Sequence, residues 1–172
     1  MKTHRTKFDP NKFIFEEDIC RIKLYDRDCN EVGEAIIDIE DYEKVKDYKW
    51  SFQGAGYVRS TMAGYLHHVI LGFEPKGHRK ETDHINGKKF DNRKINLRIC
   101  SPSQNRCNIG KRKSNKSEVK GVYRVKNSNR WRAAIYKNGE KVHLGYYGSK
   151  EKAGIAYRRA CVNLHGEFAN YN

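Results

Sequence analysis

The stretch TDHINGKKFDNRKINLRICSPSQNRCN, residues 82–108, holds the polar side chains on which the fold and chemistry of this chain depend. It contains the pair Asp83-His84 before a glycine-centred turn, followed by three spaced asparagines: Asn92, Asn96 and Asn105. Carboxylate and amide oxygens are hard ligands suited to Mg²⁺ or Mn²⁺, and a neutral imidazole can take a proton from water. Phosphodiester hydrolysis needs charge neutralisation at the phosphate and a deprotonated nucleophile. The pattern therefore indicates metal-assisted hydrolysis.

Around these residues the sequence predicts a strand, a loop, a second strand and a helix. Residues 97–100 are typical of a brief strand, and Ser101 is a suitable N-cap for a helix that runs to Asn108. Such an order would bring Asp83 and Asn105 together although 22 positions separate them. Upstream, Leu66–Phe73 has the apolar spacing of a short helix.

The first 64 residues predict a small β-rich segment. Apolar and polar residues alternate over 19–25 and 35–39, with turn residues between them, which predicts a hairpin. A short helix is expected from Tyr42, and a further strand over 57–62.

The last 54 residues predict three strands and one helix. The strands are expected over 120–126, 130–137 and 141–147, with Asn138-Gly139 as a hairpin turn between the last two. Ser149 is a candidate cap of the helix, and Gly166 stands where its left-handed terminator belongs. The expected segments are a β-rich part (1–64), a catalytic module (65–109), a basic linker (110–118) and a sheet–helix domain (119–172).

The charge of the chain points to a polyanionic partner. The net charge is +14, and it is −2 over residues 1–60, +6 over 61–111 and +10 over 112–172. This asymmetry favours nucleic acid over a membrane surface, because no basic stretch also carries a wide apolar stripe. A solubilising surface is the alternative interpretation.

Other features limit the class of protein. No apolar run is long enough to span a membrane and no signal peptide begins the chain, so we expect an intracellular protein. The five cysteines are widely spaced, with no Cys-x-x-Cys pair, which favours free thiols over a structural zinc site.

The central stretch resembles the HNH family, also called His-Me finger or ββα-metal nucleases, and especially homing endonucleases of phages and introns. The matching strings are LHH at 66–68, DHING at 83–87, DNR at 91–93, NLR at 96–98 and SQN at 103–105. The resemblance implies that Asp83 and Asn105 bind one divalent metal, Mg²⁺ or Mn²⁺, and that His84 is the general base. It also implies that Asn96 holds the metal loop, and that Arg98, with Asn92, supports the loop or contacts phosphate. Asn105 stands where the family name has a histidine, and His67 matches a family histidine without an assigned task.

Residues 119–172 resemble the DNA-binding domain of plant ethylene-response factors, the APETALA class. The matching residues include Gly121-Val122, Arg130-Trp131, Leu144-Gly145, Ala156-Tyr157 and His165-Gly166. The resemblance implies a three-stranded sheet that lies in the DNA major groove. The candidate DNA contacts are Arg124, Lys126, Arg130, Trp131, Arg132, Tyr136 and Lys137. Tyr123 and Ala134 replace an arginine and a glutamate of plant members, so the plant target sequence is not expected.

Together these features predict an α+β protein: an N-terminal β-rich segment, a ββα-metal nuclease module, and an antiparallel three-stranded sheet packed on one helix. The expected function is metal-dependent, site-selective cleavage of double-stranded DNA by a protein of phage or mobile-element origin. A DNA-binding regulator with a vestigial nuclease site is the alternative, and an RNA-binding protein is a third. A monomer is favoured over a dimer because no dimerisation signal is visible, and its one active site would cut one strand.

Overall fold

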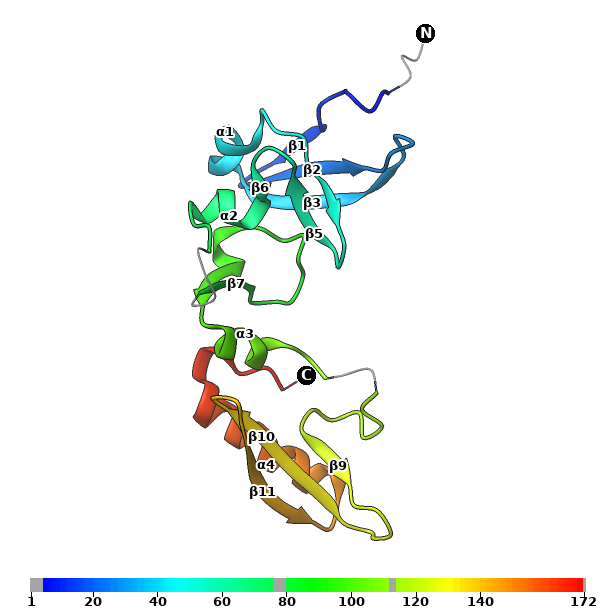
Figure 1. The fold of residues 1–172 in the computed structure, drawn as a ribbon, viewed down its shortest axis with the longest axis vertical. Helices are drawn as coiled ribbons and strands as arrows, with labels where there is room; N and C mark the ends of the chain where they lie inside the picture. The colour runs from blue at the N-terminus through cyan, green and yellow to red at the C-terminus, as the bar shows by residue number, and fades with distance from the viewer. Residues whose placement is uncertain (1–4, 76–79, 112–113, 172) are drawn as a thin grey trace. The chain divides into compact units, whose positions relative to one another are not determined.

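The computed structural model describes residues 5–75, 80–111 and 114–171 (Figure 1). It is a mixed α and β protein with several small antiparallel sheets and few helices, as the α+β prediction requires. The chain divides into two compact units, Met1–Ile99 and Cys100–Asn172. The finer division into four segments stays a prediction, and residues 112–113 of the expected linker lie outside the described part.

The first unit begins with an antiparallel sheet in the order β1-β2-β3. Its strands are β1 (Phe13–Glu16), β2 (Ile19–Tyr25) and β3 (Glu31–Asp38). The predicted hairpin is confirmed, and in its turn the N–H of Asp26 donates to the Asn30 carbonyl (3.0 Å) while the N–H of Asn30 donates to the Asp26 carboxylate (2.9 Å). Strand β1 was not predicted. It pairs with β2 in a register that sets Phe13 opposite Ile22.

A second antiparallel sheet of this unit has short strands, and helices precede and follow it in the sequence. Its strands are β4 (Ser51–Gln53), β5 (Tyr57–Ser60) and β6 (Gly64–Tyr65), in that order. The helical segments are η1 (Ile39–Asp41), α1 (Tyr42–Val45) and α2 (Leu66–Leu71). Both helices and strand β5 were predicted, whereas β4 and β6 were not.

The core of the first unit joins the N-terminal segment to the expected catalytic module. Ile22, Ile37 and Trp50 of the N-terminal segment are fully buried in one cluster with Leu66 and Leu97. The buried Asn11 side chain links two backbone segments of this core. Its amide nitrogen donates to the carbonyls of Lys23 (2.7 Å) and Trp50 (2.9 Å). Asn11 and the buried residues of the N-terminal sheets therefore belong to the same packed body as Leu66 and Leu97.

The second unit is a three-stranded antiparallel sheet covered on one face by a helix. After α3 (Pro102–Asn108), its elements are β9 (Val122–Arg124), β10 (Trp131–Lys137), β11 (Glu140–Tyr147), α4 (Lys150–His165) and η3 (Gly166–Phe168). The strand order is β11-β10-β9, and Figure 1 shows α4 lying along the sheet. Its core consists of Val122, Ala133, Ile135, Ala153, Tyr157 and Cys161.

The hairpin turn and the N-cap predicted for this unit are confirmed, whereas the left-handed helix terminator is not. Asn138 and Gly139 have φ values of 52° and 89°, as a two-residue hairpin turn requires. The Ser149 side chain accepts from the backbone N–H of Lys152 at the start of α4. Gly166 follows the helix with a φ of 51°, although its ψ of −124° lies outside the left-handed helical region. Among the described residues, no helix has both the length and the hydropathy needed to cross a bilayer.

Gly121 lies where helix α4 packs on the sheet, so a substitution there probes how close this packing is. Its φ is +72°, and an added Cβ would lie 2.0 Å from the Tyr157 ring and 2.8 Å from the Ala134 carbonyl oxygen. We expect Gly121→Ala to lower the free energy of unfolding by about 3 kcal/mol, from overlap and backbone strain together. Urea unfolding followed by circular dichroism measures this loss.

Gly139→Ala is the matched control, because Gly139 also has a positive φ but has no atom within 4 Å of the added Cβ. Its cost should be about 1 kcal/mol, the backbone strain alone. Equal losses for the two variants would contradict the packing described here.

Candidate active site

The predicted catalytic pair lies at the end of a short strand of the first unit. Strand β7 (Glu81–His84) pairs with β8 (Leu97–Cys100), and η2 (Lys94–Asn96) precedes β8. Asp83 and His84 are each only 5% exposed. The predicted order of strand, loop, strand and helix is therefore present along the chain as β7, β8 and α3.

The His84 imidazole is bonded within the loop that follows it. Its Nε2 lies 3.3 Å from Oδ1 of Asn92, which is fully buried. An amide oxygen only accepts, so this contact fits the tautomer in which Nε2 carries the hydrogen and Nδ1 is unprotonated. Burial lowers the pKa of His84, against the opposing effects of the Asn92 hydrogen bond, Asp83 and Asp91, while the Lys89 charge lowers it further. The ring is therefore neutral near neutral pH and able to accept a proton.

Asn96 joins both ends of this loop. Its Oδ1 accepts from the backbone N–H of Asn86 (2.9 Å), and its amide nitrogen donates to the carbonyl of Asp91 (2.7 Å). The Asn96 carbonyl also accepts from the N–H of Ile85, the residue after His84 (2.9 Å). These contacts fit a residue that holds the loop, and its part in catalysis stays a prediction.

Strand β3 fixes the same loop from the opposite side. The N–H of Ile36 donates to the carbonyl of Phe90 (2.9 Å), and the N–H of Asn92 donates to the carbonyl of Ile36 (2.7 Å). Ile36 and Asp91 form a parallel β-bridge at this point. The position of Asn92, and through it of His84, is thus set by a strand of the N-terminal sheet.

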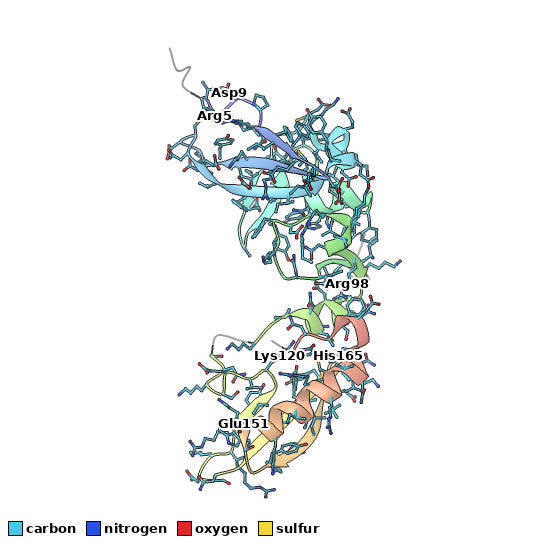
Figure 2. The ribbon with its side chains drawn as sticks, turned by 180° about the vertical axis from the view of Figure 1, so that it is seen from behind. Arg5, Asp9, Arg98, Lys120, Glu151 and His165 are labelled. Carbon is cyan, nitrogen blue, oxygen red and sulfur yellow. The ribbon has the colours of Figure 1, made fainter. Side chains whose placement is uncertain are left out.

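The two aspartates of the region have different partners. Asp91 is held by Arg93, which donates Nε and Nη2 to its two oxygens at 2.8 Å each, and the Arg93 guanidinium lowers the pKa of Asp91. Asp83 accepts from Nε (2.8 Å) and Nη2 (2.7 Å) of Arg98 through Oδ2. Arg98 is labelled in Figure 2, and its side chain is 12% exposed. Its expected DNA contact stays a prediction.

The second expected metal ligand, Asn105, lies on α3 of the second unit. The Ser101 capping box begins this helix, as predicted. Among the described residues, no group of three or more His, Cys, Asp and Glu side chains could hold a metal ion. One carboxylate and one amide oxygen still fit Mg²⁺ or Mn²⁺, because such ions commonly take few protein ligands and complete their shell with water and phosphate oxygens. The joint binding of a metal by Asp83 and Asn105 stays a prediction.

Aromatic rings that the sequence analysis did not assign surround His84. The His67 ring lies edge-on to that of His84, with centroids 5.3 Å apart, and stacks on Tyr65 at 5.4 Å. Tyr57 contacts both histidines, at 5.6 and 6.1 Å. His67 is 5% exposed, and its buried Nδ1 has no hydrogen-bond partner in the described part. The LHH string at 66–68 pointed to His67, but only the tertiary fold shows that Tyr57 lies against it.

The candidate DNA contacts of the second unit differ in exposure. Arg124, Lys126, Arg130, Tyr136 and Lys137 are exposed. Trp131 is partly buried against the core and faces the same side as Ala133. Arg132 lies on the opposite side, between its cross-strand partners Tyr123 and Tyr146.

Comparison with known proteins decides the family. A protein of Acanthamoeba polyphaga mimivirus, named an uncharacterized HNH endonuclease, is 32% identical over 143 residues, which are 80% of this chain and 74% of the relative. The chain belongs to the HNH endonuclease family. Protein 3.8 of Escherichia phage T7 is 32% identical over 97 residues, which are 56% of this HNH chain and 78% of the relative. No family model and no solved structure matches the chain.

His67 should make this HNH protein sensitive to acid. Burial, reinforced by His68 and His84, lowers the pKa of His67 from 6.5 to about 3. The unfolded state therefore binds the proton more tightly, so the stability contributed by the neutral ring is complete above pH 6.5 and is lost as the pH falls toward 3. We expect the wild type to lose about 1 kcal/mol more per pH unit below 6.5 than His67→Phe. Urea unfolding at a series of pH values measures this difference, and identical pH profiles would contradict it.

Proposed function

We propose that this chain is a metal-dependent, site-selective endonuclease that hydrolyses phosphodiester bonds of double-stranded DNA. The observation that carries the proposal is the buried, neutral His84, bonded through Nε2 to Asn92 and adjacent to Asp83. The name of the mimivirus relative supports a nuclease, and the viral sources of both relatives support a phage or viral gene.

In this proposal Asp83 and Asn105 would hold one Mg²⁺ or Mn²⁺. When bound, the ion would neutralise charge on the scissile phosphate. The pairing with Arg98 orients the Asp83 carboxylate before any ligand arrives.

His84 would act on the attacking water. Its Nδ1 would accept the proton from water, while Nε2–H stays hydrogen-bonded to Oδ1 of Asn92. Asn92 is the positioning residue, because its oxygen fixes both the orientation of the ring and the tautomer that leaves Nδ1 basic. Asn96 holds the loop on which Asn92 lies.

His84→Ala should separate cleavage from binding. We expect nicking of supercoiled plasmid in Mg²⁺ or Mn²⁺ to fall by about 10²- to 10⁴-fold, the usual contribution of a general base, while duplex binding is almost unchanged. Gel analysis of plasmid topology measures the first, and fluorescence anisotropy the second. EDTA should abolish the wild-type reaction.

Nicking by His84→Ala at the wild-type rate would refute the base assignment. Binding without any cleavage by the wild type, on DNA that contains its target, would favour the alternative of a DNA-binding regulator.

We also propose that the open face of the β9–β11 sheet binds the DNA. On this face the Arg132 guanidinium lies 5.5 Å from the Tyr123 ring centroid, and the Arg130 guanidinium 5.4 Å from that of Tyr146. Lys141 lies 5.6 Å from Tyr123. Such cations stay available to phosphates and base edges because aromatic rings, not carboxylates, hold them. Helix α4 covers the opposite face.

Arg132→Gln tests this surface. It lies at the centre of the face, and its Nε is buried without a hydrogen-bond partner in the described part. We expect the slope of log affinity against log salt to fall by about 0.9 if the lost contact is to phosphate, or discrimination at one base pair to fall by about 1–3 kcal/mol if it is to a base. Arg159→Gln, an exposed change on α4, is the control. Equal binding by Arg132→Gln, Arg159→Gln and the wild type would refute the assignment.

A further inference from the structure

One face of the small β4-β5-β6 sheet carries aromatic and basic side chains next to His84. Tyr57 and Arg59 alternate with the buried residues Val58 and Ser60 along β5. Arg59 pairs across the sheet with Tyr65, so their side chains share the face that holds Tyr57. Val58 belongs to the core of the unit, which places the Tyr57 face on the opposite side.

Two cations lie on the rings of this face. The Arg59 guanidinium is 5.6 Å from the Tyr65 ring centroid, and the Lys89 ammonium is 4.1 Å from that of Tyr57. The Tyr57 and Tyr65 rings are themselves in contact, with centroids 5.9 Å apart. Loop residue Lys89 and strand residue Arg59 therefore flank one continuous aromatic surface.

Neither cation is neutralised within the described part of the chain. The ion pairs of this part include neither Arg59 nor Lys89. Nε of Arg59 is buried without a hydrogen-bond partner, which costs free energy unless a ligand supplies an acceptor. Lys89 donates to the Ala55 carbonyl (3.2 Å), which leaves two of its three N–H groups for another acceptor.

The same surface reaches the proposed general base. Tyr57 contacts both His67 and His84, and Tyr65 stacks on His67. The Lys89 ammonium lies 4.1 Å from the centroid of the Tyr57 ring, and that ring lies 6.1 Å from the ring of His84. An anion held by Lys89 would thus lie close to His84.

We propose that Arg59 and Lys89 bind backbone phosphates of the DNA strand beside the bond that the water activated by His84 attacks. The inference rests on the proposed nuclease function and adds a substrate contact to it. Arginine and lysine are the side chains best suited to phosphate oxygens, and rings that hold their positions reduce the entropy lost on binding.

The ion pairs of the N-terminal segment explain why the net charge of the sequence did not predict a phosphate contact at Arg59. The net charge of −2 over residues 1–60 gives no indication of phosphate binding there. Acidic residues of this segment pair with other cations, however: Glu34 binds Arg21 and Lys23, and Glu16 binds Arg21. The positive potential at Arg59 is therefore not cancelled by a local ion pair.

The test is the salt dependence of DNA binding by the full chain in a His84→Ala background without divalent metal. The probe is a short fluorescein-labelled duplex of arbitrary sequence, and the readout is anisotropy against salt concentration. Arg59→Gln and Lys89→Gln keep side-chain length and remove the charge. Each should lower the slope of log affinity against log salt by about 0.9, and the double variant by about twice that amount.

Arg27→Gln is the matched control, because Arg27 is an exposed arginine of the same unit in the β2–β3 turn. Lys89→Arg should restore the wild-type slope, and circular dichroism identifies any variant that misfolds. If Arg59→Gln misfolds, the salt slopes of Arg59→Lys, Lys89→Gln and Lys89→Arg decide whether these cations bind phosphate. Slopes unchanged from Arg27→Gln would overturn the proposal.

Cleavage assays in the His84-containing protein separate the two proposals. Reduced salt slopes without any wild-type cleavage would leave the phosphate contacts standing and refute the nuclease function. Normal slopes with active wild type would refute only the contacts. If both proposals hold, Arg59→Gln and Lys89→Gln should raise the KM for plasmid nicking more than they lower kcat, because these side chains bind neighbouring phosphates and not the reacting atoms.

Discussion

Two backbone hydrogen bonds between Ile36 and the loop at 90–92 hold the candidate site on the core of the first unit. Ile36 lies on β3, whose neighbours Ala35 and Ile37 are fully buried. The loop therefore inherits the rigidity of a packed sheet, and Asn92 presents its oxygen to His84 from a fixed backbone. A general base on a loop without this support would have to order its ring at the moment of reaction.

Some charged residues of the first unit pair with opposite charges, whereas others lie on aromatic rings. Asp91, Glu34 and Asp41 pair with neighbouring cations and stabilise the fold. Arg59 and Lys89 instead lie on tyrosine rings. A ring offsets part of the desolvation cost of a cation without removing its charge, so these groups keep their attraction for anions. Net charge along the sequence conceals this distinction, because it sums both classes.

Local sequence signals predicted much of the second unit and only part of the first. Asn138-Gly139 and the Ser149 cap act within a few residues of themselves, so hairpin and helix could be located from the sequence. Strands β1, β4 and β6 are two to four residues long and depend on partners elsewhere in the chain, which short windows do not contain. The DHING and DNR strings located the loop, but the contact of Asn92 with His84 arises from the bridge to Ile36. For the same reason Tyr57 and Tyr65 were not assigned to the site.

The shared core has a practical meaning for protein engineering. Asn11 satisfies backbone groups of Lys23 and Trp50, and Leu66 and Leu97 pack among side chains contributed by the first sixty residues. An excised fragment covering only the family motifs would expose that apolar surface and lose the strand on which its loop rests. A chimera that joins the candidate nuclease unit to another DNA-binding domain would have to include the chain from before Asn11 onward.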